Sequence, residues 1–440
     1  MPFRILALDG GGIRGAISAR ILQEVEDCLR ECYPEKKNLK LNQYFDLIAG
    51  TSTGSILAAG LASGMNSQDL QKVYLTRGEE IFPYQSRFSL KRLPFAIEYK
   101  LANLKAAFAG IAEDFSHQQN PLFNPTRYKQ LFSLFKNSPK FPHTGLIQVL
   151  KEHLHDLKIT EIEDTKLLIL AYDTFYKNTT FFTNYKGESR WFDDVKLWEI
   201  CVSSSSAPTF FPPYEFNWKD PVEGEQWKFP HVDGGVSANN PALAAVIHAM
   251  YVELNKLEDI SVLSVGTGRT TDPYDYNLVK AWGLLDWAQQ IPNIFMGGQA
   301  QLGAAVCRQL IKAANPNAYL RLQFELNQRF DPDIRSGLPR RTLRKSQQYN
   351  EFLYEDNLKK GLSEEEAKTT AKVSEEIDDG REENVKKLIA TAEAFVKSDR
   401  DYTTDDQGNS ISLRQAIVNF IENNRKDRED ESARLGTSPN

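Results

Sequence analysis

Ser52 is the residue of this chain whose surroundings best suit covalent chemistry. It stands at the centre of the segment Gly-Thr-Ser-Thr-Gly over residues 50–54, between an apolar run and a run of small residues. This pattern predicts a strand, a sharp turn and a helix, because the flanking glycines relieve clashes in a turn that projects the serine hydroxyl from the sheet edge. The helix N-terminus also lowers the cost of negative charge at the hydroxyl. Ser52 is therefore a candidate nucleophile.

A glycine-rich segment near the N-terminus has the composition of an anion site. Residues 9–15 are Asp-Gly-Gly-Gly-Ile-Arg-Gly and directly follow an apolar run. Successive glycines let the backbone turn tightly and expose its N–H groups beside a helix N-terminus, which favours negative charge. Such a loop can hold a phosphate or the oxyanion of an acyl-transfer intermediate. The candidate residues are Gly10, Gly11, Gly12 and Arg14.

The same segment matches two nucleotide-binding patterns only in part. Gly10-x-Gly12-x-x-Gly15 fits the dinucleotide fingerprint, which also requires a second strand ending in an acidic residue about 20 residues further on. Residues 31–40 are polar there and have no strand pattern. A P-loop requires Gly-Lys-Ser/Thr, which does not follow. A non-catalytic module that binds a nucleotide or phosphate through this loop stays open as the alternative function.

A hydroxyl nucleophile needs a base, and Asp233 is the most pointed acidic candidate. It lies in His231-Val-Asp233-Gly-Gly, where the paired glycines predict a tight turn that aims the carboxylate. An aspartate can act as general base when it lies within hydrogen-bond reach of the hydroxyl. His231 is the rival base, because both side chains share a face if the segment is extended. A structural role for Asp233 as a turn former is the other alternative.

These residues need a scaffold, and the hydrophobic pattern predicts one of alternating strands and helices. Strands are expected at residues 3–8, 44–49, 167–172, 179–185 and 261–265. Helices are expected at residues 16–33, 53–64, 196–206 and 241–255. Strands that alternate with helices imply an α/β fold with a mainly parallel sheet covered on both faces.

Two regions depart from this pattern. Residues 80–145 are rich in Phe and Pro without strand alternation. We interpret them as a helical lid or subdomain inserted over the site, with an ordinary helical insertion as the alternative. Past about residue 355 the chain becomes polar and charged. We expect a solvated helix over 363–400 and a disordered end over 422–440.

Composition disfavours several classes of protein. Counts of 53 basic and 59 acidic residues give a net charge of −6, which speaks against a nucleic acid polymer as the main partner. Four scattered cysteines do not form a disulfide framework, and the six histidines form no zinc-type pattern. Residues 47–68 are uncharged, but their load of polar side chains disfavours a membrane span. We expect a cytoplasmic protein without a signal peptide.

The three motifs, taken in this order, resemble those of the patatin-like phospholipases. That family has an Asp-Gly-Gly-Gly-x-Arg/Lys-Gly loop, a Gly-x-Ser-x-Gly elbow and a later Asp-Gly-Gly/Ala, and all three are intact here. The likeness continues at residues 205–213, 240–242 and 263–268 and covers roughly residues 3 to 325. It implies a three-layer α/β/α sandwich, a variant of the α/β-hydrolase plan.

The resemblance also implies an activity. Ser52 would be the nucleophile and Asp233 the base of a Ser-Asp dyad. The oxyanion site would comprise Gly10, Gly11, Gly12 and Arg14. The expected reaction is hydrolysis of fatty-acyl esters of phospholipids or lysophospholipids through an acyl-enzyme, with no metal and no organic cofactor.

Partners follow from the same resemblance. A lipid substrate implies peripheral, transient contact with a membrane. Some bacterial members that resemble this chain in size act in antiviral defence, where a cyclic nucleotide switches on the degradation of membrane lipids. By that likeness a cyclic dinucleotide is a candidate activator, although no local motif identifies a site for it. The sequence does not give the oligomeric state.

The expected domain organisation follows from the need to bring Ser52 and Asp233 into one site. Residues 1–325 are expected to form one catalytic domain, with residues 80–145 as its inserted lid. Residues 326–440 are expected to form a polar, mainly helical C-terminal extension with a disordered end.

Overall fold

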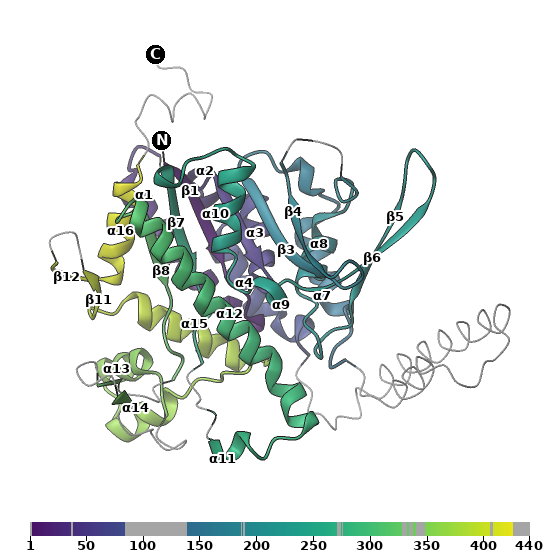
Figure 1. The fold of residues 1–440 in the computed structure, drawn as a ribbon. Helices are drawn as coiled ribbons and strands as arrows, with labels where there is room; N and C mark the ends of the chain where they lie inside the picture. Colours follow the sequence, from purple (N-terminus) through teal and green to yellow (C-terminus); the bar gives the residue numbers. More distant parts are fainter. Residues whose placement is uncertain are drawn as a thin grey trace.

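The computed structural model is built around one eight-stranded sheet (Figure 1). It describes residues 2–36, 38–83, 139–185, 187, 190–270, 274, 276–327, 332–333, 338–339, 348–404 and 408–425. The strand order is β5-β6-β3-β2-β1-β7-β8, and β4 also pairs with β3. The strands are β1 (Phe3–Leu8), β2 (Leu47–Thr51), β3 (Lys166–Asp173), β4 (Asn178–Thr183), β5 (Tyr214–Lys219), β6 (Gln226–Asp233), β7 (Ile260–Val265) and β8 (Tyr319–Leu322).

The sheet is parallel through its centre and antiparallel at one side. Strands β3, β2, β1, β7 and β8 pair in parallel, whereas β4 and β6 pair antiparallel to β3, and β5 pairs antiparallel to β6. The carboxyl ends of the central strands therefore meet at one edge, where the loops that follow β1 and β2 come together. The register pairs Leu8 with Gly50, so the two glycine-containing turns begin side by side.

Helices cover both faces of the sheet, as the alternating strand pattern predicts. Ile5 and Ala7 of β1 pack into a core with α10 and α12, whereas Leu6 and Leu8 point to the opposite core with α1, α3 and α4. Successive side chains of a strand point to opposite faces, so these two apolar sets give two separate cores. The expected three-layer α/β/α sandwich is confirmed. The helices on the first face are α10 (Ala242–Tyr251) and α12 (Leu284–Ala314), and those on the second include α1 (Gly15–Cys32), α3 (Thr53–Ala62) and α4 (Ser67–Ile81).

The remaining elements flank these layers. They are α2 (Leu41–Tyr44), α7 (Thr144–Leu154), α8 (Leu197–Ser204), α9 (Gly235–Ala238), α11 (Tyr276–Val279), α13 (Glu351–Lys359), α14 (Glu364–Thr370), α15 (Glu382–Val396) and α16 (Leu413–Asn423). Short 3₁₀ turns lie at Gly12–Arg14, Ile159–Glu161 and Leu257–Asp259. Two short hairpins pair β9 (Pro332–Asp333) with β10 (Leu338–Pro339) and β11 (Asp401–Thr404) with β12 (Ser410–Ser412).

The elements predicted from periodicity are found, with two boundaries misplaced by three or more residues. The helix expected at 241–255 is α10, which ends at Tyr251. The strand expected at 44–49 begins at Leu47, because residues 41–44 form the short helix α2. The uncharged stretch 47–68 divides into β2 and α3, and no helix of the described residues is both long enough and apolar enough to span a membrane. Strands β5, β6 and β8 and the 31-residue helix α12 were not predicted.

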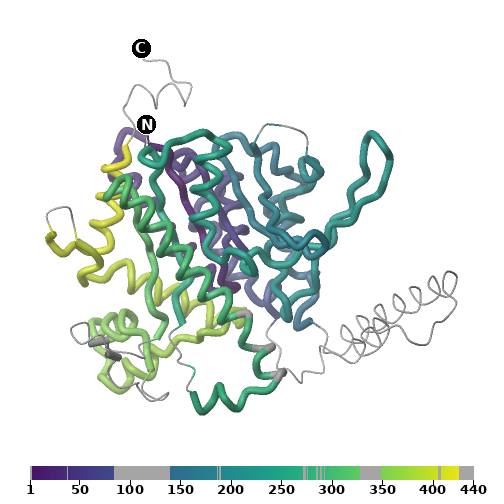
Figure 2. The backbone as a smooth tube through the Cα atoms, viewed as in Figure 1, coloured from purple at the N-terminus to yellow at the C-terminus, as the bar shows by residue number. Residues whose placement is uncertain are grey.

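The chain beyond residue 348 packs against α1 and is not a solvated helix. Figure 2 shows this region in yellow-green and yellow beside the helical layer that contains α1. The expected helix over 363–400 is instead two helices, α14 and α15, and the second buries Leu388 and Phe395 in the same core as α1. The sequence is polar overall, but its few apolar residues lie on one side of α15 and are therefore buried.

Most of the Phe-rich insertion lies outside the described residues. Residues 84–138 are not described, and the described ends of the insertion belong to α4 and α7. At the base of the insertion, Phe82 and Phe141 pack edge to face with ring centroids 6.3 Å apart. The disordered end expected over 422–440 lies mostly outside the described residues too, and residues 422–423 are the last of α16.

Candidate active site

Ser52 occupies a strained turn between β2 and α3. Its backbone has φ 54° and ψ −134°, a conformation that residues other than glycine rarely adopt. The flanking glycines permit this turn, because a Cβ atom at Gly50 would lie 2.3 Å from the carbonyl oxygen of Gly54. A Cβ atom at Gly54 would lie equally close, at 2.3 Å, to the carbonyl oxygen of Leu8. The turn is therefore the predicted nucleophile elbow, with the hydroxyl at the carboxyl edge of the sheet.

The structure brings Ser52 and Asp233 together across 181 positions of sequence. The Ser52 hydroxyl donates to Oδ2 of Asp233 at 2.6 Å. Asp233 ends β6, which pairs antiparallel with β3, and Oδ1 accepts from the N–H of Gly235 at 2.7 Å. This second contact fixes the orientation of the carboxylate. The paired glycines after Asp233 provide that donor, as the expected tight turn requires.

Asp233 is a fully buried carboxyl group. Burial raises the pKa of Asp233 to about 7, and the hydrogen bonds from Ser52 and Gly235 only partly offset this effect. Removal from water disfavours the charged form, whereas donated hydrogen bonds favour it. A carboxyl group with this pKa can both accept and return a proton near neutral pH.

His231, the rival base, lies away from Ser52. Its Nε2 is 2.7 Å from the hydroxyl of Thr180, and its Nδ1 is 3.0 Å from the carbonyl oxygen of Phe229. The ring is buried among aromatic side chains, and this burial lowers the pKa of His231. Both ring nitrogens thus have partners other than the nucleophile. The structure therefore does not support His231 as the base, because its side chain does not line the cavity that contains Ser52.

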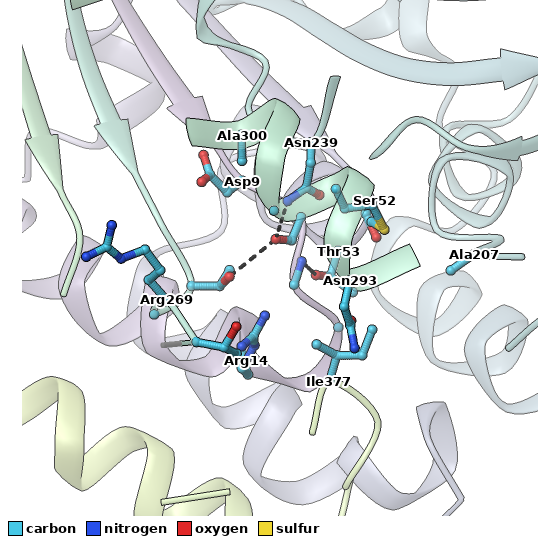
Figure 3. A pocket seen from close by; sticks show the side chains of 18 of the residues that line it. Asp9, Arg14, Ser52, Thr53, Ala207, Asn239, Arg269, Asn293, Ala300 and Ile377 are labelled. Carbon is cyan, nitrogen blue, oxygen red and sulfur yellow. Dashed lines mark hydrogen bonds between the residues drawn. The ribbon is translucent and has the colours of Figure 1, made fainter. Parts of the chain in front are cut away.

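The glycine-rich loop adjoins the elbow, and two of its amides already have acceptors. The N–H of Gly10 donates to the carbonyl oxygen of Asn239 at 3.0 Å. The N–H of Gly11 donates to the Thr53 hydroxyl at 3.3 Å (Figure 3). No described residue accepts from the N–H of Gly12 or Thr53. These two N–H groups can therefore donate to a bound anion. Gly12 belongs to the glycine loop and Thr53 to the turn after β2.

Arg14 presents a cation to the same cavity. Its Nε and Nη1 atoms are enclosed and have no hydrogen-bond partner among the described residues. Desolvation lowers the pKa of Arg14 to about 10, although the carboxylate of Glu375 favours its charged form. The guanidinium is still protonated near neutral pH, so Arg14 supplies positive charge beside the glycine loop.

A buried polar network behind the loop was not predicted. Asp9 forms an ion pair with Arg321 of β8 and accepts from Nδ2 of Asn240 at 2.7 Å. The Asn240 amide and the Arg321 guanidinium both also donate to the hydroxyl of Ser264. The segment 240–242 had been singled out by likeness only, without a role. Long-range pairing of this kind has no local sequence pattern.

The C-terminal chain also reaches the glycine loop. The N–H of Ile13 donates to the carbonyl oxygen of Ile377 at 2.8 Å. A Cβ atom at Gly12, whose φ is +60°, would lie 1.9 Å from that oxygen. Asp378 next to it pairs with Lys140, at the end of the Phe-rich insertion. Residues 377–378 thus hold both the loop and the base of the insertion, which no motif of the sequence indicated.

These parts surround one cavity of about 560 Å³. Apolar side chains in its lining include Phe82, Phe210, Phe211, Met296 and Ile377. Polar and charged side chains in the same lining include Arg14, Arg269, Thr270, Gln323 and Glu375. Ser52 and Asp233 lie in the same cavity. Among the described residues, no three His, Cys, Asp or Glu side chains are placed to share a metal ion.

Comparison with known proteins agrees with this site. The model of the family described as Patatin-like phospholipase matches residues 6–246, more than half of the 440 residues. The chain belongs to the patatin-like phospholipase family. It is 32% identical over 300 residues to Patatin-like protein 3 of Arabidopsis thaliana, covering 64% of this chain and 63% of that protein. It is 29% identical over 350 residues to Patatin-like protein 1 of Oryza sativa subsp. indica, covering 72% and 73%.

The family model matches only some of the segments that form the site. The glycine loop, Ser52 and Asp233 fall within residues 6–246, whereas α12, β8 and the Ile377 segment lie beyond them. A further relative, at 26% identity, is named Probable inactive patatin-3-Kuras 1, so family membership alone does not decide activity. The solved structure of human GIVD cytosolic phospholipase A2 aligns over 96% of this chain and 61% of that protein's chain, with 11% sequence identity and a TM-score of 0.40.

Proposed function

We propose that this patatin-like protein is a serine acyl hydrolase that cleaves fatty-acyl esters of membrane phospholipids or lysophospholipids. The observation that carries the proposal is the 2.6 Å hydrogen bond from the Ser52 hydroxyl to Oδ2 of Asp233. A binding module for phosphate needs no base within reach of a serine held in a strained turn. The bond therefore supports catalysis over the non-catalytic alternative.

The proposed reaction has two halves. Asp233 accepts the Ser52 proton as Oγ attacks the ester carbonyl carbon, and the carbonyl oxygen becomes an oxyanion. The N–H groups of Gly12 and Thr53 and the Arg14 guanidinium are placed to stabilise that negative charge. The C–O bond to the glycerol then breaks, and Asp233 returns the proton to the leaving oxygen. Asp233 then takes a proton from water as its oxygen attacks the acyl carbon. The bond from that carbon to Ser52 Oγ breaks, Asp233 returns the proton to Oγ, and the fatty acid leaves.

The composition of the cavity supports a lipid ester as substrate. Aromatic side chains of Phe82, Phe210 and Phe211 can contact an acyl chain, because apolar contact excludes water from both. The Arg14 guanidinium in the same lining suits the phosphate of such a molecule. A volume of about 560 Å³ lies within the usual range for ligand sites.

Covalent labelling tests the nucleophile directly. The full chain is expected to react with a fluorophosphonate probe and to hydrolyse a soluble fatty-acyl ester, and Ser52→Ala is expected to do neither. Asp233→Asn should lower kcat/KM by about 10²–10⁴, the usual contribution of a general base. His231→Ala is the matched control and should keep its kcat/KM, because His231 is not the proposed base. Its Tm shows whether this variant is folded. Unchanged hydrolysis by Ser52→Ala would refute the proposal.

Effector gating is tested in the same assay. Hydrolysis of zwitterionic and anionic phospholipids is measured with and without cyclic dinucleotides. Gating by a cyclic dinucleotide is an expectation that rests on the resemblance to bacterial family members. Full activity without any additive would contradict gating while leaving the hydrolase proposal intact.

A further inference from the structure

An exposed apolar face is formed by α11 and the first half of α12. Its members are Tyr276, Leu278, Trp287, Ile291 and Phe295, and we refer to this set as the α11–α12 face. Tyr276 is 75% exposed and Phe295 is 57% exposed, which is unusual for such large side chains. Residues 287, 291 and 295 are spaced four apart, so they lie along one side of the helix.

The opposite side of the same helix lines the catalytic cavity. Asn293, Met296 and Ala300 contribute to the cavity wall, and Met296 directly follows Phe295. Figure 1 shows α11 and the start of α12 at the end of the molecule beyond the carboxyl ends of the central strands. Ser52 directly follows β2 at that edge of the sheet. The apolar face and the cavity are therefore separated by the thickness of one helix.

The composition of the face fits one kind of partner. Trp and Tyr prefer the boundary between lipid chains and water, where an apolar ring carries one polar group. Between residues 272 and 295 the sequence has three acidic residues, Asp272, Asp275 and Asp286, and one basic residue, Lys280, so this segment gives no attraction to anionic lipids. The chain as a whole carries a net charge of −6, which gives no attraction to anionic lipids. Contact with a bilayer must then come from apolar surface.

We propose that the α11–α12 face docks on the surface of a phospholipid bilayer and holds the cavity next to its substrate. The inference rests on the proposed function, because only a lipid-cleaving enzyme needs its cavity at a bilayer. Phe295 and Ile291 enter the boundary region, and α12 forms the wall between the bilayer and Ser52. The bound state needs no anionic lipid and is insensitive to salt, since no charge pairing is involved.

The test compares vesicle binding with soluble turnover. The full chain is mixed with phosphatidylcholine vesicles and floated in a density gradient at low and at high salt. The double variant Ile291→Asn with Phe295→Asn is expected to reduce the bound fraction at least about tenfold, because two exposed apolar groups are replaced by amides. Its kcat/KM on a water-soluble ester should be unchanged, since neither side chain lines the cavity.

The matched control replaces two apolar residues that are even more exposed elsewhere. Val222→Asn with Tyr251→Asn, at positions 90% and 76% exposed, should leave vesicle binding unchanged. Equal loss in both double variants, or binding abolished by high salt, would overturn the inference. So would a change from oligomer to monomer in light scattering of the Ile291/Phe295 variant, which would assign the face to a second copy. Failure to hydrolyse the soluble ester would instead count against the proposed function.

Discussion

Asp233 shows how one residue links burial to chemistry. Its carboxyl group is fully buried, and this burial raises its pKa to about 7 while Ser52 and Gly235 partly compensate. The proposed base is therefore protonated under mildly acidic conditions. Because a protonated carboxyl cannot accept the Ser52 proton, the chemistry depends on pH near neutrality.

The pH profile tests this directly. We expect kcat/KM on a soluble ester to fall about tenfold per pH unit below pH 7 and to level off above it. The inflection should lie near the Asp233 pKa, far above the ordinary range of an aspartate. A stopped assay across pH 5 to 9, with circular dichroism at each pH as the control for folding, measures it. A flat profile down to pH 5 would show that Asp233 is not the group that limits the reaction.

The same burial should cost stability. Between the unfolded pKa near 3.8 and the folded pKa near 7, the folded state binds more protons, so stability is lost as pH rises through 7. Asp233→Asn removes the buried charge. We expect the stability of this variant relative to the parent to improve by about 2–3 kcal/mol from pH 5 to pH 8. Urea unfolding of both proteins at pH 5 and pH 8 measures the difference in their free energies of unfolding. The same difference at both pH values would contradict the prediction.

The sequence pointed to the proposed nucleophile and base because their surroundings are local. Ser52 and Asp233 each sit beside glycines that a strained or tight turn requires, so their neighbours in sequence reveal them. The acceptors that hold the glycine loop, Asn239 and Thr53, come from other turns. Such partners are set by the tertiary arrangement and leave no periodic pattern in the chain.

At the scale of the elements, α12 carries the most unusual pattern. Gly297 and Gly298 stand in the middle of this 31-residue helix, and a Cβ atom at either would meet nothing within 4 Å. Glycine in a helix interior lowers stability relative to alanine, since it loses more freedom on folding. Nothing in the described packing requires glycine there. By contrast, Gly12 has φ +60° and the Ile377 carbonyl beside it.

These two environments predict opposite effects of the same substitution. Gly298→Ala should raise the free energy of unfolding by about 0.5–1 kcal/mol, because the helix interior favours alanine. Gly12→Ala should lower it by about 1–3 kcal/mol, because the new methyl group meets the Ile377 oxygen and the backbone is strained. Chemical denaturation of both variants measures the signs. Two effects of the same sign would contradict the described backbone.

The unpredicted elements explain why periodicity was insufficient. Residues 226–233, which form β6, contain Lys228 and Pro230 and are half exposed, so they do not read as a buried strand. Helix α12 has polar residues such as Asn293 and Gln301 on its cavity side and apolar residues on the α11–α12 face, so its apolar residues do not lie along one stripe. Strands β1, β2 and β7 are buried on both faces and were predicted because continuous apolar runs mark such strands.

At the scale of the whole molecule, the C-terminal chain is joined to the sheet by an aromatic cluster. Phe395 of α15 lies 4.5 Å, centroid to centroid, from Phe324, which follows β8 and lines the cavity. Phe352 and Tyr402 contact the same ring. The apolar residues of this region are few, but they are concentrated where the two parts meet. The overall polarity of the sequence concealed that arrangement.

Removing the Phe395 ring should therefore destabilise the molecule as a whole. Phe395→Ala is expected to lower the free energy of unfolding by about 3–5 kcal/mol, the usual cost of removing a buried phenyl ring. Lys386→Ala on the exposed side of α15 is the matched control and should change it by no more than about 0.5 kcal/mol. Calorimetry shows whether unfolding stays a single transition. A small effect of Phe395→Ala, with a separate early transition, would mean that the C-terminal chain unfolds independently.

The hydrogen bond from Ile13 to the Ile377 carbonyl has a consequence for biosynthesis. A nascent chain that has emerged as far as residue 325 already contains the glycine loop, Ser52 and Asp233, but it lacks the segment against which the loop rests. The hydrogen bond from Ile13 can form only after Ile377 has left the ribosome. The glycine loop, which is synthesised first, therefore gains this support only when most of the chain has been made.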